Sequence, residues 1–250
     1  MTDAKQLTIE TDSKETSRPW DGVRLPMVEV FETIEGEGTQ AGYMTTFVRV
    51  FNCNLRCAWC DTPYSYAPEK PAYYASIAET ADHVKTFANP RVCLTGGEPL
   101  MHGEKSRMLL RALAELDSVE DIHVETNGAI DLSPFRHDRE TYEQLFSKVR
   151  FIVDYKLPSS GEMEKMVSSN FACLGPQDEV KFVIGSRADF DTALSVLITH
   201  YRQGYVLFSP VFESMPAEEL AALMIEHRLK HVKLNVQIHK YIWDPHRRGV

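Results

Sequence analysis

The stretch TFVRVFNCNLRCAWCDT, residues 46–62, joins a short apolar run to three closely spaced cysteines. Its first part, Thr46–Val50, has the length and the β-branched residues of a buried strand. Cys53, Cys57 and Cys60 follow on a loop, with the spacing C-x3-C-x2-C. Barrels and open parallel sheets carry their functional residues at the carboxyl ends of their strands. The stretch therefore predicts a parallel α/β fold with a functional site on this loop.

An apolar strand followed by a polar, helix-like segment recurs along the rest of the chain. Further strands are expected at Met27–Glu32, Val92–Thr95, Ile122–Glu125, Arg150–Asp154, Val180–Ile184, Tyr205–Phe208 and His231–Val236. Helices are expected from a capping box at residues 76–79 to about Ala88, near Lys105–Leu116, Glu140–Lys148 and Arg187–Tyr201, and over Ala217–Arg228, just after Pro216. The alternation predicts a mostly parallel sheet with right-handed crossovers. About six such units suit an open, partial β/α barrel, and a doubly wound sheet is the alternative.

Chemically distinctive segments follow most of these strands. They are TGGEP at 95–99, ETNG at 125–128, DYK at 154–156, SP at 209–210 and QIHK at 237–240. The carboxyl ends of parallel strands meet at one edge of the sheet. We therefore expect these segments and the cysteine loop to share one cavity.

The overall composition restricts the class of protein. The chain has 36 acidic and 27 basic residues and a formal net charge of −9, which disfavours binding to a nucleic-acid backbone. No stretch has the roughly 20 apolar residues that span a bilayer, and residues 1–22 lack the apolar core of a signal peptide. We expect a cytoplasmic protein that binds neither nucleic acid nor membrane. Residues 1–22 are expected to form a poorly ordered polar leader, and residues 23–250 a single domain.

The clustered cysteines indicate a metal centre. The chain has five cysteines, an odd number in a sequence without an export signal, so a disulfide framework is not expected. Three thiolates on one loop can bind three corners of a cubic [4Fe–4S] cluster and leave the fourth iron open. Such an iron can chelate a small molecule through an amine and a carboxylate. A structural zinc site and unrelated buried cysteines are the alternatives, although zinc normally takes four ligands and no second cysteine pair is present.

The loop Phe51–Thr62 resembles the cluster-binding loop of the radical S-adenosylmethionine superfamily, and Thr95–Pro99 resembles its glycine-rich loop, which receives the methionine amino group. The resemblance implies a [4Fe–4S] cluster that reductively cleaves S-adenosylmethionine to methionine and a 5′-deoxyadenosyl radical. That radical removes a hydrogen atom from the substrate. A glycyl-radical-enzyme activase shares the cysteine spacing and is one alternative; a non-catalytic metal-binding module is the other.

Three further segments resemble one family within that superfamily, the 7-carboxy-7-deazaguanine synthases of queuosine biosynthesis. They are FETIEGEGTQAG at 31–42, CDT at 60–62 and NVQIHK at 235–240, and the likeness runs from about Pro26 to the C-terminus. The resemblance implies a radical ring contraction of 6-carboxy-5,6,7,8-tetrahydropterin to 7-carboxy-7-deazaguanine with loss of ammonia. S-adenosylmethionine is regenerated and Mg²⁺ assists. A homodimer and a flavodoxin-like or similar reductant are implied as well.

The resemblance also implies roles for single residues. The substrate would be bound by Ile34, Glu35, Gly36, Glu37, Arg49, Thr95 and Gln237, and the candidate catalytic residues are Glu125 and His239. S-adenosylmethionine would be contacted by Trp59, Asp61, Gly97, Asp154, Tyr155, Lys156, Ser209, Pro210, Val211 and Phe212. Cys53, Cys57 and Cys60 would bind the cluster, and Thr62 would bind Mg²⁺. Arg49 offers a fork of donors for a carboxylate, while Glu35, Glu37 and Glu125 offer acceptors for the amide-rich edge of a pterin.

The chain departs from the family pattern at four places. Members commonly have Gln at the position of Glu35, a Ser-Pro pair at Asp154-Tyr155 and a Gln-Pro pair at Ser209-Pro210. Some members end near the position of Trp243 and use their terminal carboxylate in the site, whereas this chain continues to Val250. The contacts to the pterin edge, and those to S-adenosylmethionine from Asp154 onward, are therefore the ones we expect to differ.

Overall fold

The structure is a computed structural model that describes residues 18–245 and 247–249. Its strands form one nine-stranded sheet in the order β3-β1-β2-β4-β5-β6-β7-β8-β9. The strands are β1 (Arg24–Ile34), β2 (Met44–Val50), β3 (Tyr73–Ser76), β4 (Arg91–Gly96), β5 (Asp121–Thr126), β6 (Val149–Asp154), β7 (Glu179–Ile184), β8 (Tyr205–Pro210) and β9 (Val232–Leu234). All neighbouring pairs from β2 to β9 are parallel, while β1 pairs antiparallel with β2 and β3. The predicted, mostly parallel sheet is confirmed, and the sequence reading missed only the short edge strand β3 among these strands.

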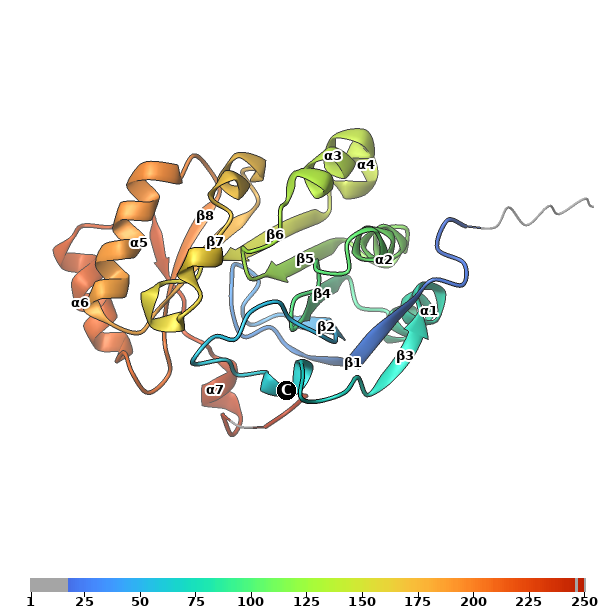
Figure 1. Ribbon diagram of the computed structural model, residues 1–250, viewed down its shortest axis with the longest axis horizontal. Coiled ribbons are helices and arrows are strands. Elements are labelled where there is room, and N and C mark those ends of the chain that lie inside the picture. The colour runs from blue at the N-terminus through green and yellow to red at the C-terminus, as the bar shows by residue number, and fades with distance from the viewer. Residues whose placement is uncertain (1–17, 246, 250) are drawn as a thin grey trace, which may run out of the picture.

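The order of the strands distinguishes a partial barrel from a doubly wound sheet. From β2 to β9 the strands stand in the sheet in the order in which they occur in the chain. A doubly wound sheet reverses that order at a switch point, and these strands show no reversal. Right-handed crossovers that always step in one direction place their helices on one face. Figure 1 shows the helices on the outside of a curved row of strands, so the expected open, partial barrel is confirmed.

Four long helices follow strands β3, β4, β7 and β8. They are α1 (Ile77–Phe87), α2 (Glu104–Ala114), α5 (Arg187–His200) and α6 (Ala217–Glu226), close to the predicted bounds. The capping box of α1 is present: the Ser76 hydroxyl accepts from the Glu79 N–H at 3.1 Å, and the Glu79 carboxylate accepts from the Ser76 N–H at 2.7 Å. None of the described helices is long and apolar enough to cross a membrane.

The helix predicted at Glu140–Lys148 is wrong in its bounds. The chain instead forms α3 (Ser133–Thr141) and the short α4 (Glu143–Phe146), with a break at Tyr142. Pro134 lies in the first turn of α3, a start signal that the sequence reading overlooked. The break brings Phe146, which is fully buried, back to the core.

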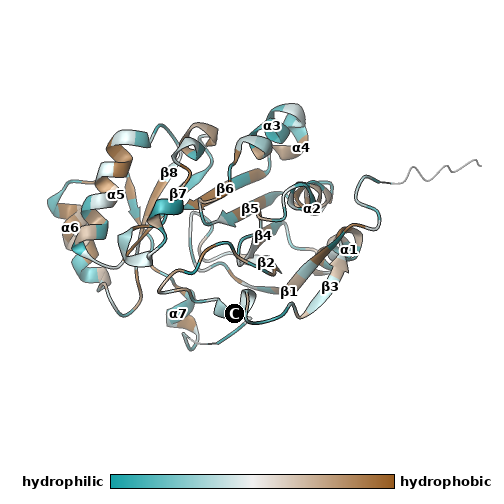
Figure 2. Cartoon of the chain, in the orientation of Figure 1, coloured by the Kyte–Doolittle hydropathy of each residue, from teal (hydrophilic) through white to brown (hydrophobic). Residues whose placement is uncertain are grey.

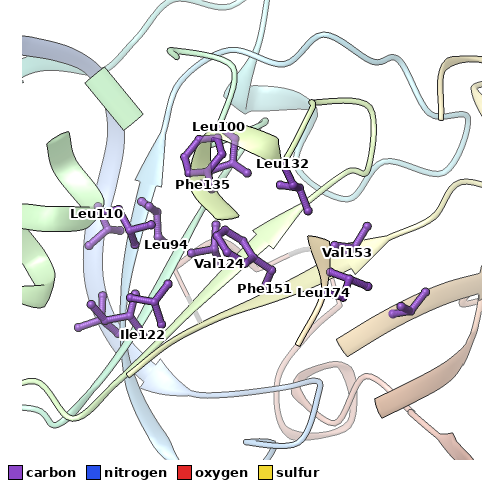
Figure 3. Packing of buried hydrophobic residues seen from close by; sticks show 14 of the residues in the cluster. Leu94, Leu100, Leu110, Ile122, Val124, Leu132, Phe135, Phe151, Val153 and Leu174 are labelled. Atoms are coloured by element: carbon purple, nitrogen blue, oxygen red, sulfur yellow. The ribbon is translucent and has the colours of Figure 1, made fainter. Parts of the chain in front are cut away.

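The hydrophobic core lies between the strands and the helices. Alternate residues of each strand point to that side, and they are the apolar ones: Val92, Leu94, Ile122, Val124, Phe151, Val153, Val180, Phe182 and Ile184. Figure 3 shows Leu94, Ile122, Val124 and Phe151 next to Leu110 of α2 and Phe135 of α3. Each such fully buried side chain contributes about 1.5–3 kcal/mol. Figure 2 shows hydrophobic residues, coloured brown, along β6, β8 and one part of α5.

The opposite, inner face of the sheet carries charged side chains. His123 of β5, Arg150 of β6, and Glu179 and Lys181 of β7 are all buried there. The turn between β1 and β2, residues 35–42, enters the barrel from the amino ends of the parallel strands and meets these charges. The Thr39 N–H and hydroxyl donate to the Glu179 carboxylate, which also pairs with Arg150. Paired charges of this kind anchor the turn as the floor of the barrel.

The polar leader expected over residues 1–22 falls mostly outside the described residues. Of its described part, Trp20 is 1% exposed and belongs to the hydrophobic core. The Arg111 guanidinium of α2 lies 5.7 Å from the Trp20 ring centroid. The packed part of the chain therefore starts before residue 23.

Candidate active site

The cysteine loop leaves the carboxyl end of β2 and is anchored to three other loops. Leu55, which is buried, fixes its middle to the core, and the Arg56 N–H donates to the Glu162 carboxylate at 2.6 Å. The Asn127 amide, from the loop after β5, donates to Cys53 Sγ at 3.6 Å. Cys53, Cys57 and Cys60 are all half-buried free thiols. The loop is therefore held from several sides with its sulfur atoms partly accessible.

The three sulfur atoms are not grouped as they would be around one zinc ion. Four-coordinate zinc, about 2.3 Å from each sulfur, would bring the sulfur atoms within about 4 Å of one another. Among the described residues, only Glu35, Cys93 and His123 form a group of three His, Cys, Asp or Glu side chains whose ligand atoms all lie within 4.8 Å. The three loop cysteines are therefore spread too widely for one zinc ion. Burial raises the pKa of Cys57 to about 11, so binding of iron there must release a proton.

The glycine-rich segment 95–99 lies directly against the cysteine loop. A side chain at Gly97 would place its Cβ 2.3 Å from the Asn52 carbonyl oxygen, and one at Gly96 would lie 2.5 Å from the Val50 carbonyl oxygen. Only glycine permits this approach of two backbones. The buried Glu98 carboxylate accepts hydrogen bonds from the N–H groups of Leu100 and Asn127, which fix the segment. The expected proximity of Gly97 and the cysteines is confirmed in space.

Two buried polar atoms beside the cysteine loop lack a hydrogen-bond partner within the described part of the chain. They are Trp59 Nε1, a donor, and Asp154 Oδ1, an acceptor. Lys156 Nζ lies between them: it donates to Asp154 Oδ2 at 2.8 Å and lies 4.9 Å from the Trp59 ring centroid. Buried polar groups normally have partners, so this pair indicates a missing polar ligand. A ribose with its two hydroxyls, each a donor and an acceptor, fits that requirement.

The remaining expected contacts to S-adenosylmethionine differ in orientation. The Tyr155 ring packs against Phe171 and Phe182 in the core, so only its backbone faces the site. Ser209 and Pro210 end β8, and the Ser209 hydroxyl accepts from the Asn235 amide at 2.8 Å.

Beyond β8 the chain lines a cavity of about 160 Å³. Pro210, Phe212, Val236, Gln237 and Tyr241 are among its walls. Gln237 thus borders both this cavity and the barrel interior, which joins the two halves of the predicted site. Val211 follows Pro210 and is only partly buried.

Arg49 lies at the carboxyl end of β2 and is held by an acidic partner. Its Nε donates to Glu29 Oε1 at 2.9 Å, and the Tyr64 hydroxyl donates to the same oxygen at 3.3 Å. Burial by itself would lower the pKa of Arg49. Tyr64, Glu29 and Asp61 outweigh burial, so the pKa is raised above its ordinary value. The guanidinium is therefore charged and fixed through Nε. Its Nη1 donates a long hydrogen bond to the Gly96 carbonyl at 3.4 Å, and the remaining Nη donors are left for another acceptor.

Glu37 and Glu125 meet in the barrel interior around Lys181. Glu37 Oε2 accepts from Lys181 Nζ at 2.9 Å, and Glu37 Oε1 accepts from the Gln237 amide at 2.7 Å. Burial by itself would raise the pKa of Glu37. Lys181, Gln237 and His239 outweigh burial and lower the pKa to about 2. The Thr95 hydroxyl donates to Glu125 Oε2 at 3.1 Å. Burial raises the pKa of Glu125, a shift that Lys181 opposes.

Glu35 is a buried residue of the turn after β1 and contacts His123. Its Oε2 lies 2.6 Å from His123 Nε2, and its Oε1 accepts from the Glu37 N–H at 3.1 Å. Burial lowers the pKa of His123, but Cys93, Glu35 and Asp121 raise it well above its ordinary value. Glu35 is therefore a buried ion-pair partner of His123 that orients the turn.

Gly36 is where the last loop meets that turn. A Cβ on Gly36 would lie 2.0 Å from His239 Nδ1, and the Gly36 carbonyl accepts from the Ile238 N–H at 3.0 Å. His239 begins α7 (His239–Ile242). The absence of a side chain at Gly36 therefore gives the His239 ring its place against the turn between β1 and β2.

Thr62 and Asp61 complete the cysteine loop. The Thr62 hydroxyl lies 3.8 Å from Cys60 Sγ, and the Asp61 side chain is exposed. Thr62 thus stands at the edge of the cluster position, where a hydroxyl can reach a metal ion. Its partners are protein atoms alone, so Mg²⁺ binding stays a prediction.

Lys181 and His123 are the residues that the sequence reading missed. Both are charged or polar residues inside apolar strand runs, at inner-face positions. Arg49, whose role the family resemblance implies, carries the same signal. A charge at an alternate position of a buried strand therefore identifies interior residues of the barrel.

Known proteins place this fold and loop in one class. A family model described as the Radical SAM superfamily matches residues 48–153, which contain the cysteine loop and the glycine-rich segment. A crystal structure of QueE from Escherichia coli superposes with a TM-score of 0.63 at 20% identity, covering 87% of this chain and 96% of that one, which supports the fold. The fold and the loop define a radical S-adenosylmethionine enzyme, whose family carries a [4Fe–4S] cluster and S-adenosylmethionine.

The relatives then narrow the class to one family. The 7-carboxy-7-deazaguanine synthase of Clostridium acetobutylicum is 36% identical over 90% of this chain and 98% of its own. The synthase of Chlorobaculum tepidum is 36% identical over 90% of this chain and 97% of its own. The chain belongs to the 7-carboxy-7-deazaguanine synthase family.

Proposed function

We propose that this protein converts 6-carboxy-5,6,7,8-tetrahydropterin to 7-carboxy-7-deazaguanine by a radical ring contraction that expels ammonia, in queuosine biosynthesis. One observation carries the proposal: the cysteine loop, Gly97 and Arg49 converge at the carboxyl ends of β2 and β4 in a chain that aligns over 90% of its length with synthases of that name. Cys53, Cys57 and Cys60 would hold a cluster that would supply the electron for reductive cleavage of S-adenosylmethionine and so for hydrogen abstraction from the substrate. The protein's own residues bind and orient the reactants.

The charges in the barrel interior and at the end of β2 match a carboxylated pterin. Arg49 is fixed by Glu29 through Nε, and its Nη1 also donates to the Gly96 carbonyl at 3.4 Å. The remaining Nη donors would bind the substrate carboxylate. Glu125 is the most exposed of the three acidic candidates, with 27% of its side chain accessible, against 12% for Glu37. Glu125 is therefore the carboxylate best placed to accept from the amide edge of the ring. Its raised pKa also suits a group that holds a proton while ammonia leaves.

The proposed contacts to S-adenosylmethionine rest on the two buried polar atoms that lack a partner in the described part of the chain. Asp154 Oδ1 would accept from a ribose hydroxyl, and Trp59 Nε1 would donate to the same ligand. The absence of a side chain at Gly97 lets the glycine-rich segment pack directly on the cysteine loop, which would put its backbone beside the methionine group. Lys156 orients Asp154 by donating to its Oδ2 at 2.8 Å.

Further features of the proposal follow the family. Mg²⁺ bound at Thr62 would bridge to substrate oxygens, a flavodoxin-like or similar reductant would deliver electrons, and the enzyme would act as a cytoplasmic homodimer. The segment 23–250 would function as a single domain, which the continuous sheet supports.

The two alternatives have less support. A glycyl-radical-enzyme activase acts on a peptide loop of a large partner and needs no arginine for a substrate carboxylate, whereas Arg49 is buried at the cluster side of β2. A structural zinc module requires closely grouped ligands, which the loop cysteines do not form. The names of the relatives likewise agree with the synthase.

The decisive experiment is an anaerobic assay of the reconstituted enzyme with S-adenosylmethionine, Mg²⁺, a strong reductant and 6-carboxy-5,6,7,8-tetrahydropterin. We expect 7-carboxy-7-deazaguanine by mass spectrometry, and no product from a Cys57→Ala variant. An intact cluster that cleaves S-adenosylmethionine without forming this product would disprove the substrate assignment. Omission of Mg²⁺ tests the metal separately and should lower the rate.

A further inference from the structure

Lys181 is the point where three carboxylates from three different elements meet. Its Nζ lies 2.9 Å from Glu37 Oε2, 3.8 Å from Glu125 Oε1 and 3.8 Å from Asp154 Oδ2. These acidic residues belong to the turn after β1, to β5 and to β6, while Lys181 itself is on the inner face of β7, opposite Asp154 in the strand pairing. The lysine side chain is 9% exposed, so water screens these interactions little.

Lys181 takes one oxygen of each carboxylate and leaves the other oxygen for another partner. Glu37 Oε1 accepts from Gln237, and Glu125 Oε2 accepts from Thr95. Asp154 Oδ2 is shared by Lys156 and Lys181, and Asp154 Oδ1 is the buried acceptor without a partner in the described part of the chain. The position of the ammonium thus determines where the second oxygen of each carboxylate points.

We propose that Lys181 is a positioning residue. It sets the substrate-binding part and the S-adenosylmethionine-binding part of the barrel interior relative to each other. Glu37 and Glu125 belong to the substrate-binding part, and Asp154 belongs to the S-adenosylmethionine-binding part. The inference rests on the proposed function, and it adds a residue to which neither the chain's motifs nor its relatives' names assign a role. Radical transfer requires the two reactants in contact, so an error in their relative placement would affect the reaction more than the binding of either alone.

The charge balance gives the physical reason. Glu37, Glu125 and Asp154 face Lys181 and Lys156, so the five groups together carry one net negative charge when all are ionised. Without Lys181 the same space would hold three carboxylates against one lysine. Like charges in a buried space repel, so the carboxylates would turn apart or take up protons. Either response moves the oxygens that the ligands require.

The test compares Lys181→Met with Lys181→Arg in the reconstituted holoenzyme. Anaerobic calorimetry would measure the Kd of S-adenosylmethionine and that of 6-carboxypterin, the oxidised form that cannot react by hydrogen transfer. For Lys181→Met we expect both Kd values to rise, that of 6-carboxypterin by about tenfold or more, with unchanged iron content. The fraction of 5′-deoxyadenosine formed without product should also rise. Lys181→Arg, which keeps the charge, should restore part of each quantity.

Lys148→Met is the matched control. Lys148 Nζ donates to the carbonyls of Leu116 and Val119 outside the cavity, so its loss also removes a partly buried ammonium. This variant should bind both ligands as the wild type does. The positioning role is wrong if Lys181→Met binds both ligands within about twofold of the wild type and forms no more 5′-deoxyadenosine without product. It is also wrong if the variant loses iron and thermal stability in proportion to binding.

Failure of the Lys181 proposal can be distinguished from failure of the proposed function. A wild-type protein that binds S-adenosylmethionine but not 6-carboxypterin disproves the proposed substrate. In that case the Kd of S-adenosylmethionine in Lys181→Met, with Asp154 as the responsible carboxylate, still decides the role of Lys181. Should Lys181→Met fail to fold, Lys181→Gln, which can still donate to Glu37, takes its place in the same measurements.

Discussion

Arg49 illustrates how a single side chain is prepared for a ligand. Its Nε is bound by Glu29, whose carboxylate also accepts from Tyr64, and the Arg248 guanidinium lies 4.0 Å from the Tyr64 ring centroid. The pairing fixes the direction of the guanidinium, and only the 3.4 Å contact of Nη1 with the Gly96 carbonyl uses its Nη edge. A donor that is already fixed loses less entropy when a carboxylate binds.

Replacing Arg49 should therefore separate substrate binding from cluster assembly. For Arg49→Ala we expect the Kd of 6-carboxypterin to rise by about tenfold or more, because a bidentate charged partner is lost. Iron content and the Kd of S-adenosylmethionine should stay near wild type. Arg49→Lys, a point charge without the fork, should lie between the two.

The control is Arg136→Ala, which removes an arginine that pairs with Glu140 on the exposed side of α3. Its binding constants should equal those of the wild type. Equal losses of cluster and substrate binding in Arg49→Ala would mean that Arg49 holds the fold and does not bind the substrate.

At the scale of elements, local signals determine where helices begin. The capping box of α1 was predictable because Ser76 and Glu79 satisfy each other's backbone donors through residues three apart. The bounds of α3 and α4 were not, since the break at Tyr142 depends on Phe146 reaching the distant core. Missing β3 has a similar cause: its four residues are exposed or half-buried for the most part and pair only with β1, about 50 residues earlier.

Removing the cap of α1 should cost measurable stability. Ser76→Ala leaves the Glu79 N–H without its side-chain acceptor, and we expect the free energy of unfolding to fall by about 1 kcal/mol. Anaerobic urea unfolding of the holoenzyme would measure it. Ser195→Ala, in the exposed middle of α5, should be neutral or slightly stabilising. A loss as large in Ser195→Ala would show that the cap is not the cause.

At the scale of the whole molecule, the barrel has two different interiors. Between the sheet and the helices the side chains are apolar, and the hydrophobic effect stabilises the fold there. On the inner face, Glu35, His123, Arg150, Glu179 and Lys181 form ion pairs around the turn after β1. Buried pairs of this kind add little net stability, but loss of one partner is costly. The inner face therefore makes the stability depend on pH.

Glu37 gives that dependence a sign. Its pKa is lowered from 4.5 to about 2 in the folded protein, so its ionised form stabilises the fold above the unfolded value, and this contribution is lost as the pH falls through the folded value. The wild type should lose stability between about pH 5 and about pH 3 more steeply than a Glu37→Gln variant does. Thermal unfolding at a series of pH values would measure both slopes. Parallel slopes, equal to that of the exposed Glu226→Gln control, would contradict the assignment.

The sequence by itself determined the alternation of strands and helices, the cysteine loop and most residues that surround it. Those features depend on neighbours in the chain: a two-residue period marks a strand, and thiols three and four residues apart can share one cluster. Tertiary structure alone decided that the parallel strands never reverse order, that Glu35 pairs with His123, that Tyr155 turns into the core, and that Lys181 collects three carboxylates. These contacts join residues from about 25 to about 145 positions apart, and their energies depend on burial, which no local pattern encodes.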